Sequence, residues 1–243
     1  MNTLVQGNAR TLDSGVLAIA LTGFVASTYG FGVYLFANLV VDMRRDLGFD
    51  YTTVGLITGG AQIGFLLFSS VTSVISRYVA GWKISLASTV MTSLALLGLS
   101  ISDTIWLSGA LLILLGGCSA SVYIPLAEIV TKGFSAGLRS RVMGLISSGT
   151  SYGVFINGLL VSFLTMHGGW RGIWLTAGLI SLTLCVVAWY LLRNLATSEE
   201  GDAAGEPGQT SDRHAPWLSR SLYLTWGIAF LNGMALLPFQ KKV

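Results

Sequence analysis

Charged side chains are scarce in this sequence. Its 243 residues include only 14 Lys and Arg and 11 Asp and Glu, about 10% in all, whereas 53% are hydrophobic. A soluble domain covers its surface with roughly 25% charged residues. Water therefore cannot be the solvent for most of this surface, and the composition indicates a membrane protein.

Cysteine and histidine are also rare, with two residues of each. Both cysteines, Cys118 and Cys185, fall in apolar stretches, where helix packing is their expected role. So few ligand-type side chains predict no metal site, and no cofactor is expected. A net charge of +3 without a basic, aromatic-rich surface argues against nucleic acid as a partner.

Sequence motifs of catalysis are missing as well. No glycine-rich loop ends in Lys-Ser or Lys-Thr to hold phosphate, and no nucleophile stands beside a base. The sequence therefore predicts neither an enzyme nor an ATP-driven pump.

The few charges that exist fall in short clusters separated by long uncharged stretches. A helix needs roughly 20 apolar residues to cross the hydrocarbon core. Seven stretches are of about this length or longer: 14–41, 51–76, 84–102, 104–127, 142–170, 172–192 and 221–240. We predict an all-α transmembrane protein with seven helices.

Lysine and arginine are distributed unequally between the two sides of these spans. If the N-terminus is cytoplasmic, nine of them lie in inside segments and three in outside segments before the seventh span. The positive-inside rule then favours a cytoplasmic N-terminus. We expect a multi-pass protein of a bacterial inner (plasma) membrane, embedded in the lipid bilayer.

The stretch after the sixth span is acidic and nearly free of large apolar residues, so it is predicted to be a flexible cytoplasmic linker. The predicted organisation is a six-helix bundle over 1–192, a linker over 193–218, and a seventh helix over 219–243. We expect this last segment to be the truncated start of a second bundle. Lys241 and Lys242 would lie outside, against the charge rule, which suggests truncated or frame-shifted sequence.

The sequence resembles itself at a shift of 89 residues. Residues 55–64 align with 144–153, and five of these ten positions are identical. Gly-Trp-Lys at 81–83 meets Gly-Trp-Arg at 169–171 at nearly the same shift. A repeat unit of three helices must insert its second copy inverted, as in many secondary transporters.

Three loop motifs then carry a resemblance to a family. Asp-Leu-Gly-Phe-Asp-Tyr-Thr-Thr-Val-Gly at 46–55, Arg-Ser-Arg-Val-Met-Gly at 139–144 and Gly-Trp-Arg-Gly-Ile-Trp at 169–174 resemble loops of the major facilitator superfamily. The resemblance covers nearly all of residues 14–192. It implies a carrier of two six-helix halves with a central cavity.

Some loop positions keep the family pattern and others depart from it. The residues that match its gate or loop motifs are Arg77, Gly81, Lys83, Arg139, Arg141 and Arg171. Ser76 stands where the family has an aspartate of its cytoplasmic charge-pair gate, so we expect that gate to be weakened. Leu112 stands four residues before Gly116, where many proton-coupled members carry an arginine.

Polar and aromatic residues within the spans are the candidates for a substrate cavity. Four share a predicted helical face in the first span, and the others lie in the second, fourth and fifth. These candidates are Ser27, Phe31, Tyr34, Asn38, Gln62, Ser119, Tyr123, Tyr152 and Asn157. The competing interpretation is that they are packing residues whose polar groups bond to neighbouring helices.

No Asp, Glu, Lys or Arg lies deep in the first six spans. This is unusual for a proton-driven carrier with its own relay. From the repeat and the resemblance we predict a secondary carrier of a small organic solute, working by alternating access with a missing C-terminal half as partner. One alternative is a non-transporting seven-helix receptor or scaffold. Another is a homodimer of half-transporters.

Overall fold

The computed structural model describes residues 15–199, without the side chains of 165–168 and 191–199. The predicted seventh helix and most of the predicted linker lie outside the described residues. The backbone of the last helix stays helical to Glu199, past residue 193, where the linker was predicted to begin.

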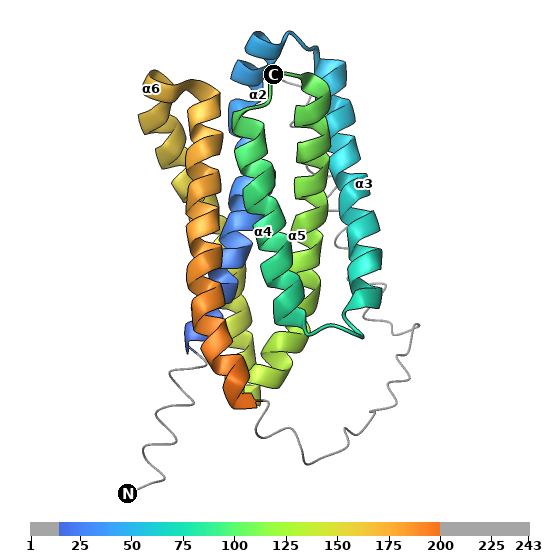
Figure 1. Ribbon diagram of the computed structural model, residues 1–243, viewed down its shortest axis with the longest axis vertical. Helices are drawn as coiled ribbons and strands as arrows, with labels where there is room; N and C mark the ends of the chain where they lie inside the picture. The colour runs from blue at the N-terminus through green and yellow to red at the C-terminus, as the bar shows by residue number, and fades with distance from the viewer. Residues whose placement is uncertain (1–14, 200–243) are drawn as a thin grey trace, which may run out of the picture. The chain divides into compact units, whose positions relative to one another are not determined.

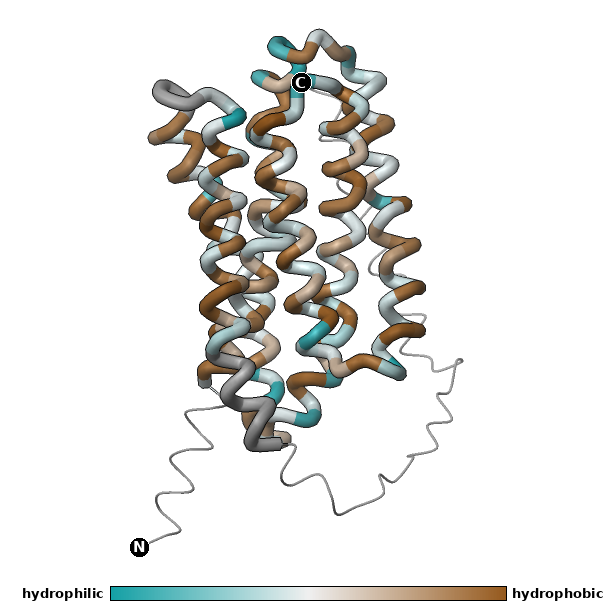
Figure 2. Tube along the Cα trace, in the orientation of Figure 1, coloured by the Kyte–Doolittle hydropathy of each residue, from teal (hydrophilic) through white to brown (hydrophobic). Residues whose placement is uncertain are grey.

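Six helices in the described residues are long and apolar enough to cross a membrane. They are Gly15–Leu47, Tyr51–Ile75, Gly81–Ser100, Ile105–Gly133, Ala136–Leu164 and Gly169–Tyr190. No strand occurs in 15–199. The predicted all-α transmembrane bundle is confirmed, and Figure 2 shows hydrophilic positions mostly near the helix ends, with apolar residues along their lengths.

The first helix, Gly15–Leu47, is not wound uniformly. Its middle, η1 (Ala26–Tyr34), is a π-helix, and α2 (Leu35–Leu47) continues it as an α-helix. The helices that follow are α3 (Tyr51–Ile75), α4 (Gly81–Ser100), α5 (Ile105–Gly133) and α6 (Ala136–Glu199). Helix α6 is broken at Gly169, where φ is 57° and ψ is −168°.

Local sequence explains where the helices begin and end. Gly48, with φ of 68°, ends α2 in the left-handed conformation that glycine adopts readily. Asp50 caps α3 by accepting a 2.9 Å hydrogen bond from the Thr53 amide. Gly169 serves as the equivalent break between the fifth and sixth spans, because its positive φ lets the chain turn sharply.

The packing of helices follows the predicted repeat. Helix α3 packs along α5, and the first helix packs along the first part of α6, Ala136–Leu164. Figure 1 shows successive helices running in alternating directions, so the second three-helix unit is inverted relative to the first. The two close pairs are therefore second with fourth and fifth with first, as an inverted repeat requires.

Glycines allow both pairs to approach closely. A Cβ on Gly64 would lie 2.7 Å from the Ile113 carbonyl oxygen, and one on Gly153 would lie 2.5 Å from the Ala26 oxygen. Gly64 and Gly153 are separated by the 89-residue shift of the repeat. In lipid no hydrophobic effect drives helices together, and small residues allow the close van der Waals packing that does.

Apolar side chains fill the interior and also cover much of the exterior. Phe31, Leu35 and Trp174 are fully buried, whereas Leu56 and Phe155 are 71% and 67% exposed on α3 and α6. Exposed apolar residues on a membrane-length helix are suited to contact with lipid or with another helix.

Candidate functional site

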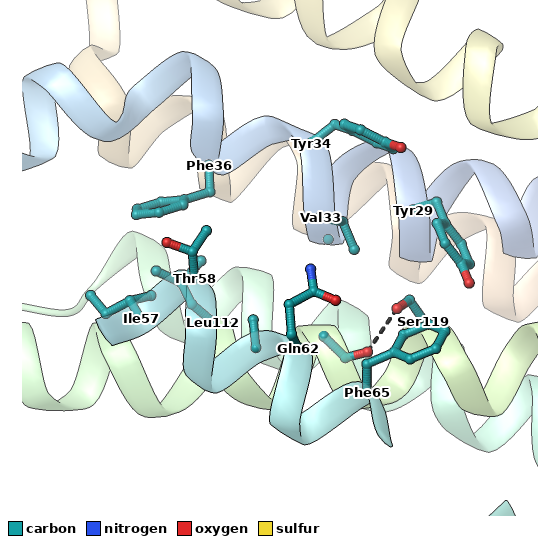
Figure 3. Close-up of a pocket in the computed structure, with 13 residues that line it drawn as sticks. Tyr29, Val33, Tyr34, Phe36, Ile57, Thr58, Gln62, Phe65, Leu112 and Ser119 are labelled. Carbon is teal, nitrogen blue, oxygen red and sulfur yellow. Dashed lines mark hydrogen bonds between the residues drawn. The ribbon is translucent and has the colours of Figure 1, made fainter. Parts of the chain in front are cut away.

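A cavity of about 210 Å³ lies between the first helix, α3 and α5. Figure 3 shows its lining in close-up. The residues that line it are Tyr29, Gly32, Val33, Tyr34, Phe36, Ile57, Thr58, Ala61, Gln62, Phe65, Leu112, Gly116 and Ser119. Drug-sized ligands occupy pockets of roughly 300–1,000 Å³, so this one suits a smaller molecule.

Hydrogen-bonding groups of the cavity are neutral. The Gln62 amide extends from α3 across the gap toward the segment that carries Val33 (Figure 3). The Ser119 hydroxyl donates a 2.7 Å hydrogen bond to the Gly116 carbonyl, and the Tyr29 side chain lies beside Ser119 in the cavity wall (Figure 3). The lining thus offers one amide and several hydroxyls.

An aromatic contact holds one of the hydroxyl-bearing side chains, Tyr29, in place. The rings of Tyr29 and Tyr123 meet edge to face, with centroids 5.7 Å apart and an interplanar angle of 64°. This arrangement is favourable for aromatic quadrupoles and fixes the Tyr29 ring at the cavity wall.

None of the thirteen lining residues is charged. Leu112, at the position where many family members have arginine, is 4% exposed and lines the cavity as part of the apolar core. Such a wall can hold an apolar group against aromatic and aliphatic side chains. It can orient a polar group through neutral hydrogen bonds.

The structure brings together only some of the predicted cavity residues. Tyr34, Gln62 and Ser119 line the cavity, and Tyr123 contacts it through the Tyr29 ring. The remaining candidates lie elsewhere: Ser27, Phe31, Asn38, Tyr152 and Asn157.

These remaining residues have other surroundings. Ser27 and Phe31 are fully buried, and Ser27 donates a 2.7 Å hydrogen bond to Ser181 of α6. Asn38 and Tyr152 are exposed outside the cavity. The four candidates of the first helix differ in exposure, because Ser27 and Phe31 are buried whereas Tyr34 and Asn38 are exposed.

Sequence reasoning missed most of the apolar lining and one central residue, Tyr29. A signal for part of it was present, because Thr58, Gln62 and Phe65 follow the i, i+4, i+7 spacing of one face of α3. The same signal existed on the first helix, where Tyr29, Val33 and Phe36 of the lining follow this spacing. The row of Ser27, Phe31, Tyr34 and Asn38 was chosen instead, and Tyr29 was missed.

Loop-motif residues occupy two different kinds of position. Arg77, Lys83 and Arg141 are exposed, and the described residues provide no ion pair for any of them. Arg139 instead donates hydrogen bonds of 3.0 and 2.7 Å to the Phe134 and Thr131 carbonyls. It therefore satisfies carbonyls at the C-terminus of α5.

Gly81 is a packing position. A Cβ there would lie 2.8 Å from the Pro125 side chain, so glycine lets the start of α4 approach α5.

Arg171 joins three helix ends. It pairs with Asp46 at the end of α2, and its Nη2 lies 3.1 Å from the Asp103 carboxylate between α4 and α5. The Trp170 indole donates a 3.1 Å hydrogen bond to the same Asp46 carboxylate. The guanidinium carbon also lies 4.2 Å from the Trp170 ring centroid. This cluster ties the ends of the first, third and sixth spans together.

A family model for the major facilitator superfamily matches residues 21–239, most of the chain. The chain belongs to the major facilitator superfamily. The chain is similar to human monocarboxylate transporter 14, with 33% identity over 98 residues, which is 40% of this chain and 18% of the human protein. Mouse monocarboxylate transporter 14 is 34% identical over 68 positions, 28% of this chain and 13% of the mouse protein.

Family membership and the six membrane-length helices agree on a multi-pass membrane protein. The matched segments span less than a fifth of either curated relative. Residues 15–199 contain no group of His, Cys, Asp or Glu that could hold a metal ion, within what the structure describes.

Proposed function

We propose that this transporter is a secondary carrier that moves a small organic solute by alternating access, and that the cavity is one wall of its solute site. The observation that carries the proposal is the cavity itself. It is a neutral, amide- and hydroxyl-bearing hollow between three membrane-length helices. A polar hollow inside a membrane bundle is costly unless it serves a ligand or a water path.

The composition of the wall defines the solute class that we propose. Phe36, Phe65 and Leu112 favour an apolar portion, whereas Gln62 and Tyr29 favour a group that forms hydrogen bonds. We propose an amphipathic solute. The name of the similar mammalian proteins makes a monocarboxylate the first compound to test, its carboxylate accepting hydrogen bonds from the Gln62 amide and the tyrosine hydroxyls.

Alternating access needs a second half to complete the site, and we propose that a second six-helix bundle is this partner. Close glycine contacts, of Gly64 in α3 with α5 and of Gly153 in α6 with the first helix, keep each pair in one unit. Arg171 also holds the unit together, because its ion pairs with Asp46 and Asp103 join three helix ends. We propose that the bundle rocks as one body.

The orientation is also a proposal. The lysine and arginine distribution supports a cytoplasmic N-terminus. An epitope tag placed before residue 1 should resist protease added outside intact cells and become sensitive after the membrane is permeabilised. Cleavage of the tag on intact cells would reverse the assignment.

The test of the solute site compares two variants of α3. Gln62→Leu removes the amide from the cavity, and Ser73→Ala removes an exposed hydroxyl that bonds to the Ser69 carbonyl of its own helix. Flux of a labelled monocarboxylate and of a neutral amphipathic solute is measured in proteoliposomes. Losing one hydrogen bond to a solute should reduce flux by about fivefold to a hundredfold in Gln62→Leu.

Ser73→Ala should transport like the unaltered protein. Equal flux in the Gln62→Leu variant and the unaltered protein, for every solute that the protein moves, would remove Gln62 and its cavity from the proposed site.

A further inference from the structure

The π-helical middle of the first helix is the least regular part of the described bundle. It runs for nine residues, Ala26–Tyr34. Winding of this kind is rare, usually lasts a single turn, and is frequent at functional sites. Four residues of this segment line the cavity: Tyr29, Gly32, Val33 and Tyr34.

Helix α6 fixes this segment from the side away from the cavity. Gly149 and Gly153, four residues apart on α6, face Thr22 and Ala26, also four residues apart. A Cβ on Gly153 would lie 2.6 Å from the Gly30 Cα. Backbone meets backbone along this crossing, so the position of the first helix is set by direct contact.

Asn157 stands one turn beyond Gly153 in the same row and is fully buried. Its Nδ2 donates a 2.6 Å hydrogen bond to the Gly30 carbonyl, in the middle of the π-helix. The i→i+5 pattern of a π-helix changes which amide each carbonyl can reach, and the Asn157 amide gives this carbonyl a donor from outside the helix.

The Asn157 side chain is only half satisfied. Its Oδ1 is buried and has no hydrogen-bond partner among the described residues. An unpaired buried amide oxygen is unfavourable, and an apolar side chain of similar size would avoid the penalty. Helix packing alone therefore gives no reason for an asparagine here, whereas the bond to Gly30 does.

A change in the winding of this segment would alter which side chains reach the cavity. An α-helix turns about 100° per residue, so adding or removing one residue from a turn rotates everything beyond it by about that angle. Ser27 and Phe31 are fully buried while Tyr34 is 46% exposed, although regular spacing would place all three on one face. Relaxation of the segment to α-helix would rotate Tyr29 and Tyr34 relative to Gln62.

We propose that Asn157 is a positioning residue for the solute cavity. By holding the Gly30 carbonyl, it keeps Ala26–Tyr34 in the π-helical form and so sets which side chains of the first helix face the solute. The role in solute selection rests on the proposed transport function; the role in winding does not.

The test separates these two roles. Cys118 and Cys185 are both buried, and replacing them with alanine leaves a background for single cysteines at positions 29, 31, 33 and 34. The rate at which a water-soluble maleimide modifies each cysteine is measured in reconstituted membranes. The same rates are then measured with Asn157→Leu, which keeps the size of the side chain but removes its donor.

Ser181→Ala is the matched control. It removes another fully buried hydrogen bond between α6 and the first helix, the 2.7 Å bond from Ser27, without touching Gly30. We expect Asn157→Leu to change the ratio of rates at positions 33 and 34 by about tenfold, the effect of one lost buried hydrogen bond on an equilibrium. Ser181→Ala should leave that ratio unchanged.

Unchanged ratios in Asn157→Leu overturn the proposal, and so does an equal change in Ser181→Ala, which would reveal general loosening. Asn157→Ala is measured in parallel, and decides the result if the leucine variant does not accumulate. In the unmodified cysteine background, Asn157→Leu should also alter the ratio of fluxes of two transported solutes. If no variant transports any solute, the proposed function fails while the labelling still decides the winding.

Discussion

The two close helix pairs of the bundle are copies of one arrangement that have diverged in chemistry. Gly60 and Gly64 of α3 pack against α5, and Gly149 and Gly153, 89 residues later, pack against the first helix. One turn beyond, the copies differ. Phe68 places its ring against Gly117, whereas Asn157 at the equivalent position bonds to the Gly30 carbonyl.

This difference coincides with a difference in backbone. Helix α5 is α-helical over its 29 residues, whereas the first helix contains nine π-helical residues. The apolar contact accompanies a regular helix, and the polar contact accompanies an irregular one that lines the cavity. The repeat therefore produces the same glycine crossing twice, with an apolar contact beside one crossing and a hydrogen bond beside the other.

The largest effect should come from filling the crossing between the first helix and α6. In Gly153→Val the new side chain meets the Ala26 carbonyl and the Gly30 Cα, which are backbone atoms that cannot rotate away. We expect a loss of about 3 kcal/mol in the free energy of unfolding, at the upper end of overpacking effects. Thermal unfolding in detergent measures it.

Gly158→Ala is the control on the same helix, because nothing lies within 4 Å of a Cβ there. It should leave stability unchanged or raise it by up to about 1 kcal/mol, the difference in helix propensity between alanine and glycine. A stable Gly153→Val protein would show that the first helix and α6 are not in backbone contact.

Replacing the third residue of each row, Phe68 or Asn157, should separate stability from site geometry. Phe68 is half-buried against Gly117, so Phe68→Ala should lower the free energy of unfolding by about 2 kcal/mol through lost contact. It should not change maleimide labelling at positions 33 and 34. If Phe68→Ala changes this labelling as Asn157→Leu does, the two copies are not functionally distinct.

The repeated Gly-Trp-Lys and Gly-Trp-Arg motifs allow a third comparison. Arg171 bridges Asp46 and Asp103, whereas Lys83 lies 5.4 Å from the Trp82 ring centroid and has no ion pair among the described residues. Arg171→Gln should cost about 1 kcal/mol, a modest value because the cluster is partly exposed and screened. Lys83→Gln should cost nothing measurable in the same unfolding assay.

The smallest effect concerns the start of α3, which has a carboxylate cap that α6 lacks. The Thr53 hydroxyl and amide both donate to Asp50, and these hydrogen bonds lower the pKa of its carboxyl. A lowered folded-state pKa contributes stability above the ordinary value near 4, and this contribution is lost as the pH falls through the folded pKa.

Acidification below pH 4 should therefore speed hydrogen exchange at the Thr53 amide relative to Leu138 at the start of α6, after correction for intrinsic rates. Asp50→Ala should show the faster exchange at neutral pH and lose the pH dependence. A Thr53 amide that is equally protected from hydrogen exchange at neutral pH and below pH 4 would rule out the cap.

The spans and the repeat were predictable because their causes are local and repetitive. Charges cannot enter hydrocarbon, so their spacing marks the six described helices, and the inverted repeat appears as identical glycines at one shift. Gln62 and Ser119 were found because a polar residue in an apolar span must be bonded or serve a ligand.

Other features depend on contacts between distant segments. The grouping of Ser27, Phe31, Tyr34 and Asn38 assumed a regular helix, whereas Ala26–Tyr34 is π-helical and is contacted by Gly153 and Asn157, more than a hundred residues away. Arg171 was recognisable as a motif residue, but its carboxylate partners come from two other helix ends.

Protection of the cavity by solute is the most direct test of the proposed site. A cysteine at position 33 in the Cys118→Ala, Cys185→Ala background lines the cavity, whereas one replacing exposed Ser162 on α6 lies outside it. A transported solute should slow maleimide modification at position 33 in proportion to its occupancy and leave position 162 unaffected. Equal rates at position 33 with and without saturating solute would contradict a solute site in this cavity.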